Sequence, residues 1–146
     1  MTDADGLARA CAEMMWRDDA ASRGLGMTLD HVSAGRARLS MMVRPEMVNG
    51  HGLCHGGFIF ALADSAMAFA SNGHGERAVA HHNEITYIRP GRLGETLAAT
   101  AEERVRSGRS GIYDVRVMGE DGTVVAEFRG HTRTIGQHFD PPKAGR

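Results

Sequence analysis

The residues best suited to chemistry lie in a glycine- and histidine-rich loop at residues 49–57 and in the apolar segment after it. The loop ends in His55, Gly56 and Gly57, at the expected start of a helix, where the first backbone N–H groups are unpaired and carry a partial positive charge. Two glycines expose this backbone because they lack a Cβ atom. A reacting carbonyl oxygen placed there would find an oxyanion hole. The alternative is that the glycines only turn the chain.

Asp64 is the second candidate, because it interrupts an otherwise apolar segment. A carboxylate is costly to bury among apolar side chains. Its ionisation should be perturbed there, which makes Asp64 a candidate acid, base or nucleophile. The alternative is a structural carboxylate that hydrogen-bonds a neighbouring group and helps to specify the packing.

The spacing of these two candidates has a structural consequence. Gly56 and Asp64 are eight residues apart, which is roughly 12 Å along one helix. An oxyanion donor and a nucleophile or base must both reach the same carbonyl group within about 3 Å. One chain cannot supply both, so we predict a site that combines Gly56 of one subunit with Asp64 of another.

The helix that must carry Asp64 is expected at residues 58–72, where Ala and Leu recur without Gly or Pro. It is apolar on nearly every side, so it should be buried all round. Gly73 is its expected C-terminal stop. An earlier helix is predicted around Leu7, with an acidic cap before it and a break at residues 22–26.

Strands are expected on both sides of the apolar helix, because apolar residues alternate there between short turns. The predicted strands are residues 27–32, 36–43, 79–89, 96–106, 110–118 and 123–134. Turns of only a few residues between the later strands suit antiparallel hairpins. A sheet of five to six antiparallel strands must wrap the long central helix, because nothing else in the chain can cover it. This is an α+β architecture, the hotdog fold.

The chain length suits a single domain, predicted at residues 1–136, followed by a loose C-terminal tail at residues 137–146. A wrapped sheet of this kind keeps long edge strands. Self-association is therefore expected, as a dimer with a continuous sheet.

The composition indicates no nucleic-acid or membrane partner. A formal net charge of −1 gives no overall attraction to anionic surfaces, and no uncharged run approaches the roughly 20 residues of a membrane span. The N-terminus has no apolar segment typical of a signal peptide. Two cysteines, Cys11 and Cys54, form no disulfide framework. A reduced, cytoplasmic protein is the expectation.

Several motifs along the chain form a specific combination. They are Asn49-Gly50-His51, Cys54-His55-Gly56-Gly57, Leu62-Ala63-Asp64, Ala70-Ser71-Asn72, Arg89-Pro90-Gly91, Gly94-Glu95-Thr96-Leu97, Ala99-Thr100-Ala101 and Phe128-Arg129-Gly130. On these motifs the chain resembles the phenylacetate-degradation (PaaI-like) thioesterases, a branch of the hotdog acyl-CoA thioesterases. The resemblance extends over residues 10–136.

The resemblance implies hydrolysis of acyl-CoA thioesters, typically hydroxyphenylacetyl- or phenylacetyl-CoA, without a metal or redox cofactor. Coenzyme A is then part of the substrate. The residue matching Asp64 activates water or attacks the thioester, and the amide matching Gly56 binds the thioester oxygen. The residues matching Asn49 and His55 shape the site. Relatives assemble as tetramers built from dimers, and a medium-chain acyl-CoA substrate is an alternative.

Contacts to the coenzyme are expected from Gly57 and from arginines beside turns. Three arginines flank turns at strand ends and could bind the CoA phosphates: Arg89, Arg106 and Arg109. The turn that contains Arg106 and Arg109 is the better candidate for this contact. The alternative for each is a solvated surface arginine. Residues 81–84 replace residues that are commonly small or uncharged in the family, which bears on substrate range more than on mechanism.

Three other functions are compatible with parts of the sequence. A metal-dependent hydrolase would use ligand types present in the chain, namely His51, Cys54, His55, His74, His81 and His82. However, His51 and His55, which have the i, i+4 spacing of a metal-binding pair, lie in a loop rather than on a helix, so no metal site is predicted. Glycines in the loop loosely match a dinucleotide-binding fingerprint but lack its βαβ context. A non-catalytic acyl-CoA-binding protein could share the fold, and Asp64 favours catalysis over this alternative.

Overall fold

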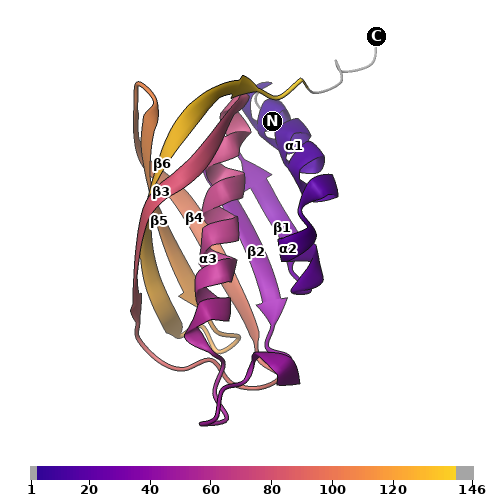
Figure 1. The fold of residues 1–146 in the computed structure, drawn as a ribbon, viewed down its shortest axis with the longest axis vertical. Helices are drawn as coiled ribbons and strands as arrows, with labels where there is room; N and C mark the ends of the chain where they lie inside the picture. Colours follow the sequence, from indigo (N-terminus) through magenta and orange to yellow (C-terminus); the bar gives the residue numbers. More distant parts are fainter. Residues whose placement is uncertain (1–2, 141–146) are drawn as a thin grey trace.

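A computed structural model describes residues 3–140 and shows one long helix held against one face of a six-stranded sheet (Figure 1). The strand order is β1-β2-β4-β5-β6-β3, and all neighbouring strands are antiparallel. This is the predicted α+β hotdog arrangement. Within the described residues, no helix combines the length and apolar character that a membrane span requires.

The elements follow the predicted order, with one short helix and two 3-10 turns added. They are α1 (Asp3–Asp18), α2 (Ala20–Gly24), β1 (Thr28–Ser33), β2 (Arg36–Met42), η1 (Pro45–Met47), α3 (Gly56–Ser71), η2 (Asn72–His74), β3 (Glu76–Tyr87), β4 (Thr96–Ser107), β5 (Ser110–Met118) and β6 (Val124–His138).

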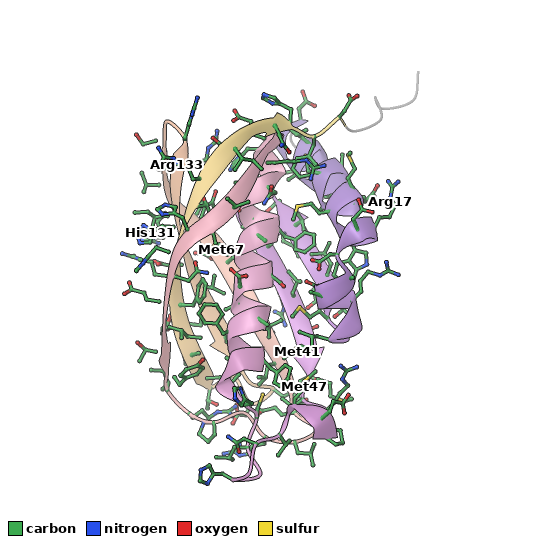
Figure 2. The ribbon with its side chains drawn as sticks, viewed as in Figure 1. Arg17, Met41, Met47, Met67, His131 and Arg133 are labelled. Atoms are coloured by element: carbon green, nitrogen blue, oxygen red, sulfur yellow. The ribbon has the colours of Figure 1, made fainter. Side chains whose placement is uncertain are left out.

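The core lies between α3 and the concave face of the sheet. Alternate residues of β2 and β4 point toward the helix, and Leu39 pairs with Ala99 in register, both fully buried. Met41 of β2 and Met67 of α3, both labelled in Figure 2, are also buried. Small side chains on both layers, such as Ala63 of α3, allow the helix to lie close to the strands.

Both ends of α3 differ from the prediction. The helix begins two residues earlier, at Gly56, because the His55 side chain caps it: Nδ1 accepts a hydrogen bond of 2.9 Å from the Gly57 N–H. It ends at Ser71 and continues as η2. Gly73 directly follows the C-cap Asn72, as predicted, but the residue with a left-handed backbone is Gly75 (φ 95°), after η2.

The prediction that α3 is buried all round is also wrong for the single chain. A stripe at helical spacing, formed by Gly57, Ala61, Asp64 and Ala68, stays partly or fully exposed. The sheet curls around only part of the helix circumference. We call these four residues the open stripe of α3.

The C-terminal strand extends beyond its predicted end. His138 pairs with Glu76, and the Phe139 N–H donates a hydrogen bond of 2.8 Å to the Gly75 carbonyl oxygen. The Phe139 side chain is buried. A loose tail from residue 137 is therefore wrong for residues 137–139, because the ladder and an apolar side chain hold them. Residues 141–146 of that prediction lie outside the described residues.

Candidate active site

Asp64 lies on the open stripe of α3 and forms part of the wall of a pocket of about 330 Å³. The remaining wall is mostly apolar, and its larger side chains are Met15, Met67, Val79, Ile135 and Phe139. The one other charged residue among the lining residues is Arg77, whose guanidinium lies 4.2 Å from the centre of the Phe139 ring. The geometry therefore places a carboxylate beside an apolar hollow.

Burial raises the pKa of the Asp64 carboxyl, and a hydrogen bond from Asn83 partly opposes this rise. The Asn83 Nδ2 donates to Asp64 Oδ1 at 3.1 Å. A reaction that needs ionised Asp64 is lost as the pH falls through this raised pKa, so the loss begins at a higher pH than for a free aspartate. This is the environment expected of a general base or nucleophile.

Asn83 was not singled out from the sequence. It comes from β3, whose register with β6 is interrupted by an irregularity between Ala80 and His82. Such a bulge changes which residues of a strand face inward, so alternation along residues 79–89 does not identify the inward-facing positions. The signal that could have found Asn83 is its polar side chain within residues 81–84, the segment expected to bear on substrate range.

Gly56 lies at a different pocket, of about 410 Å³, at the N-terminal end of α3. Asn49, Arg89 and the half-exposed Tyr87 also line it, and the Tyr87 hydroxyl donates a 2.8 Å hydrogen bond to the Gly56 carbonyl oxygen. No acceptor for the Gly56 N–H occurs among the described residues, whereas the Gly57 N–H is occupied by His55. The available donor at this helix end is therefore Gly56 rather than Gly57.

Asn49 organises the loop before the helix. Its Oδ1 accepts hydrogen bonds from the His51 N–H at 2.9 Å and the Leu53 N–H at 3.2 Å. Its backbone N–H donates to the Leu53 carbonyl oxygen at 2.8 Å. Asn49 and His55 thus hold the loop and the helix start that present Gly56.

The two pockets have no lining residue in common, so a single chain does not bring Gly56 and Asp64 together. Both groups lie on the same straight helix, where eight residues span roughly 12 Å. That a complete site takes one group from each of two subunits stays a prediction.

Arg89 is fully engaged within the chain. Its Nε donates to Thr123 Oγ1 at 2.7 Å, its two terminal nitrogens bond Glu95 at 3.0 and 2.6 Å, and further bonds reach the Pro90 carbonyl oxygen at 2.8 Å and Asp121 at 3.3 Å. A guanidinium has five N–H donors, and all five are used. The structure therefore does not support the predicted phosphate contact of Arg89, because no donor remains.

We expect Arg89→Met to lower the free energy of unfolding by about 2 kcal/mol or more, because Glu95 would lose its partner while only 11% exposed. Urea denaturation at fixed protein concentration measures this. The matched control is Arg116→Met, which removes an ion pair whose members are 58% and 43% exposed and should cost less than about 0.5 kcal/mol. Equal effects of the two substitutions would contradict the role given to Arg89.

Arg106 and Arg109 lie at the β4–β5 hairpin, next to the C-terminal end of α3 and opposite the end that carries Gly56 (Figure 1). Both are exposed, and no hydrogen bond or ion pair engages their side chains within the described residues. They line a small hollow together with Ser71 and His74. These two arginines keep free donors, which Arg89 does not.

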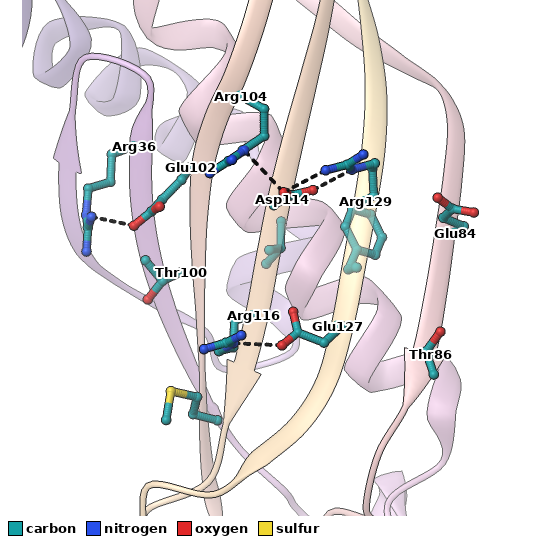
Figure 3. Close-up of a pocket in the computed structure, with 13 residues that line it drawn as sticks. Arg36, Glu84, Thr86, Thr100, Glu102, Arg104, Asp114, Arg116, Glu127 and Arg129 are labelled. Carbon is teal, nitrogen blue, oxygen red and sulfur yellow. Dashed lines mark hydrogen bonds and ion pairs between the residues drawn. The ribbon is translucent and has the colours of Figure 1, made fainter.

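A larger hollow, of about 620 Å³, lies on the outer face of the sheet and away from Asp64 (Figure 3). Apart from the exposed Glu84, its charged side chains pair with one another: Arg36 with Glu102, Arg104 and Arg129 with Asp114, and Arg116 with Glu127. We do not assign the site there, because no side chain in this hollow combines burial with an unpaired reactive group.

The structure also bears on the alternative functions. Within residues 3–140, no three His, Cys, Asp or Glu side chains are grouped as they would be around a metal ion. The strand that follows α3 pairs antiparallel with β6, so the glycine-rich loop lacks the parallel βαβ context of a dinucleotide site.

Comparison with known proteins agrees with this geometry. The sequence model of the thioesterase superfamily matches residues 51–126. The acyl-coenzyme A thioesterase PaaI of Escherichia coli is 41% identical over 86% of this chain and 89% of its own length. The solved structure of that PaaI protein, from the phenylacetic acid degradation operon, has a TM-score of 0.91 and 38% identity and covers 93% of this chain and 99% of its own. A Streptococcus mutans protein solved with acetyl-CoA bound has a TM-score of 0.75 and 25% identity over 77% of this chain and 91% of its own.

The central helix, the antiparallel sheet and these matches together identify the class of hotdog-fold thioester hydrolases. The chain belongs to the thioesterase superfamily, in which PaaI is a close relative. The predicted family, fold and class of enzyme are confirmed.

Proposed function

We propose that the chain hydrolyses acyl-CoA thioesters whose acyl group carries an aromatic ring, of the phenylacetyl or hydroxyphenylacetyl type, and releases coenzyme A and the free acid. The observation that supports this most is Asp64, a partly buried carboxylate with a raised pKa in the wall of an apolar pocket. The 41% identical relative is named an acyl-coenzyme A thioesterase, and its operon of origin is one of phenylacetic acid degradation.

Asp64 takes one of two roles in the proposed reaction. As a nucleophile, it bonds to the thioester carbonyl carbon and expels the CoA thiolate, and water then hydrolyses the resulting anhydride. As a general base, it removes a proton from the water that attacks the same carbon, and the thiolate leaves with a proton. In both cases the free N–H of Gly56 stabilises the negative charge that develops on the carbonyl oxygen.

The two groups meet across a symmetric pair of subunits. Gly56 and Asp64 are equally distant in sequence from residue 60, so two antiparallel α3 helices related by a two-fold axis near this residue would place each Gly56 beside Asp64 of the partner subunit. The open stripe of α3 offers small residues for this approach. The edge strand β3 is free to pair with its own copy and to continue the sheet.

Coenzyme A binding is assigned to Arg106 and Arg109. In the antiparallel pair, the β4–β5 hairpin of one subunit lies at the same end as Gly56 of the other. Exposed guanidinium groups without partners in the described residues suit phosphate oxygens. The reaction as proposed needs no metal or redox cofactor, since coenzyme A enters as part of the substrate.

The test is a free-thiol release assay with phenylacetyl-CoA, benzoyl-CoA and a straight-chain series. We expect phenylacetyl-CoA to have the highest kcat/KM, by about tenfold or more. The reason is that apolar contacts between the acyl group and a well-filled pocket stabilise the transition state. A straight-chain preference would keep the enzyme class and overturn the aryl assignment. Binding of acyl-CoA without thiol release would instead indicate a non-catalytic binding protein. Activity should survive treatment with a metal chelator.

A further inference from the structure

Asp64 receives one hydrogen bond from the part of the chain that the structure describes, and this bond comes from the side chain of Asn83. The Nδ2 atom of Asn83 donates to Oδ1 of Asp64 at 3.1 Å. No side chain or backbone group of the described residues donates to Oδ2. The two carboxylate oxygens are therefore in different environments, one held by an amide and one open.

Asn83 is itself held in place. It pairs in register with Gly130 of β6, and a Cβ atom at that position would lie 2.7 Å from Asn83 Oδ1 and would also clash with Met67. The absence of a side chain at Gly130 thus provides the space that the amide occupies. Packing on this side limits movement of the Asn83 side chain away from Asp64.

The other end of the amide is unsatisfied. Asn83 Oδ1 is buried and has no hydrogen-bond partner among the described residues. Rotating the amide by half a turn would place its oxygen against the Asp64 carboxylate, where two acceptors would repel each other. A buried carbonyl oxygen without a partner is unfavourable, and this orientation is maintained because the opposite end of the same amide bonds the carboxylate.

We propose that Asn83 is a positioning residue for Asp64: it fixes Oδ1 and so presents Oδ2 as the oxygen that attacks the thioester or takes the proton from water. This inference rests on the proposed function. Asn83 donates a hydrogen bond throughout and transfers no proton. The bonds formed and broken in the nucleophilic and general-base routes therefore stay as described above. A fixed carboxylate reacts faster than a freely rotating one, since less order must be created at the transition state.

The ionisation of Asp64 provides supporting evidence. Burial raises the pKa of this carboxyl, and the hydrogen bond from Asn83 acts in the opposite direction. Removing the donor should therefore raise the pKa further. The active, ionised form would then be lost at a higher pH as the solution is acidified.

The experiment compares Asn83→Leu, which has a similar volume and no donor, with Glu84→Gln as the matched control. Glu84 is the next residue on the same strand and lines the outer-face hollow instead. For Asn83→Leu we expect kcat to fall about tenfold on the plateau, with KM changed by less than about twofold. The midpoint of the acid limb of the pH profile should move to a higher pH. The control should keep the wild-type profile.

A second measurement does not require a variant. In the unaltered protein, the side-chain amide protons of Asn83 should shift in NMR spectra with a pH midpoint equal to that of the Asp64 carboxyl carbon. A folded Asn83→Leu variant with unchanged kcat and acid limb, or an Asn83 amide insensitive to this titration, would overturn the inference. The thiol-release assay of the unaltered protein separates this outcome from failure of the proposed function, which would be overturned if the wild-type protein released no thiol.

Discussion

Replacing Asp64 by Asn should lower kcat by about 100-fold or more while leaving the fold and CoA binding intact. The substitution keeps the shape of the side chain but removes the charge, so it removes a base or a nucleophile. Steady-state thiol release measures kcat, and a fluorescence titration with coenzyme A measures binding. Near-native turnover in this variant would refute the assignment of Asp64.

The stability of the same variant provides a check on folding. Because the pKa of Asp64 is raised in the folded state, its ionised form disfavours folding. This cost is absent below the unfolded-state pKa of aspartate and develops as the pH rises through the folded-state value. Asp64→Asn should therefore unfold at a higher temperature than the wild type at neutral pH, and this difference should vanish in acid. The matched control is Asp114→Asn, on the outer face, where loss of an exposed ion pair should not change kcat.

The two roles proposed for Asp64 can be distinguished by one turnover in heavy-oxygen water. Only the nucleophilic route passes through an anhydride, so only that route can transfer labelled oxygen to the carboxylate. Mass spectrometry of the peptide that contains Asp64 reads the label. General-base catalysis leaves this peptide unlabelled and places the label in the released acid.

The second large effect is expected from mixed oligomers. Asp64→Asn and Gly56→Val should each be inactive, the second because a Cβ atom at Gly56 would lie 2.9 Å from the Tyr87 ring and would crowd the oxyanion donor. In a mixed pair, one of the two shared sites combines the intact Gly56 with the intact Asp64. Such pairs should recover about half of the activity of a wild-type dimer.

The measurement needs mixed pairs that carry two different affinity tags and are purified through both. A mixture of the two separate homo-oligomers, assayed before exchange, serves as the control and should stay inactive. If verified mixed pairs show no rescue, the site does not combine groups from two subunits. A stable monomer with full turnover would lead to the same conclusion.

The sequence contained most of the information needed for the fold. Glycines at turns and alternating apolar residues located the strands, and Ala-rich composition located α3, because these features act over a few neighbouring residues. The end of α3 was less predictable. Gly73 and Gly75 are both suitable stops by type, and which of them takes the left-handed backbone depends on the packing of Gly73 against Ala8 of α1.

The two principal residues of the candidate site were proposed from the sequence, whereas their supporting contacts were not. Asp64 and Gly56 stand out by residue type alone, in an apolar helix and at its glycine-rich start. Asn83 and Tyr87 reach these residues from β3, whose register depends on an irregularity that the sequence does not reveal. The engagement of Arg89 depends on three turns that meet only in the folded chain.

The position of Phe139 has a consequence for how such an enzyme can change its preferences. The wall of the pocket facing Asp64 includes Met15 from the first helix and Phe139 from the last described segment, so both chain ends help to enclose it. Neither residue belongs to the elements that carry Asp64 or Gly56. Changes in α1 or in the segment around Phe139 can therefore reshape the space beside Asp64 while the candidate residues on α3 are left unchanged.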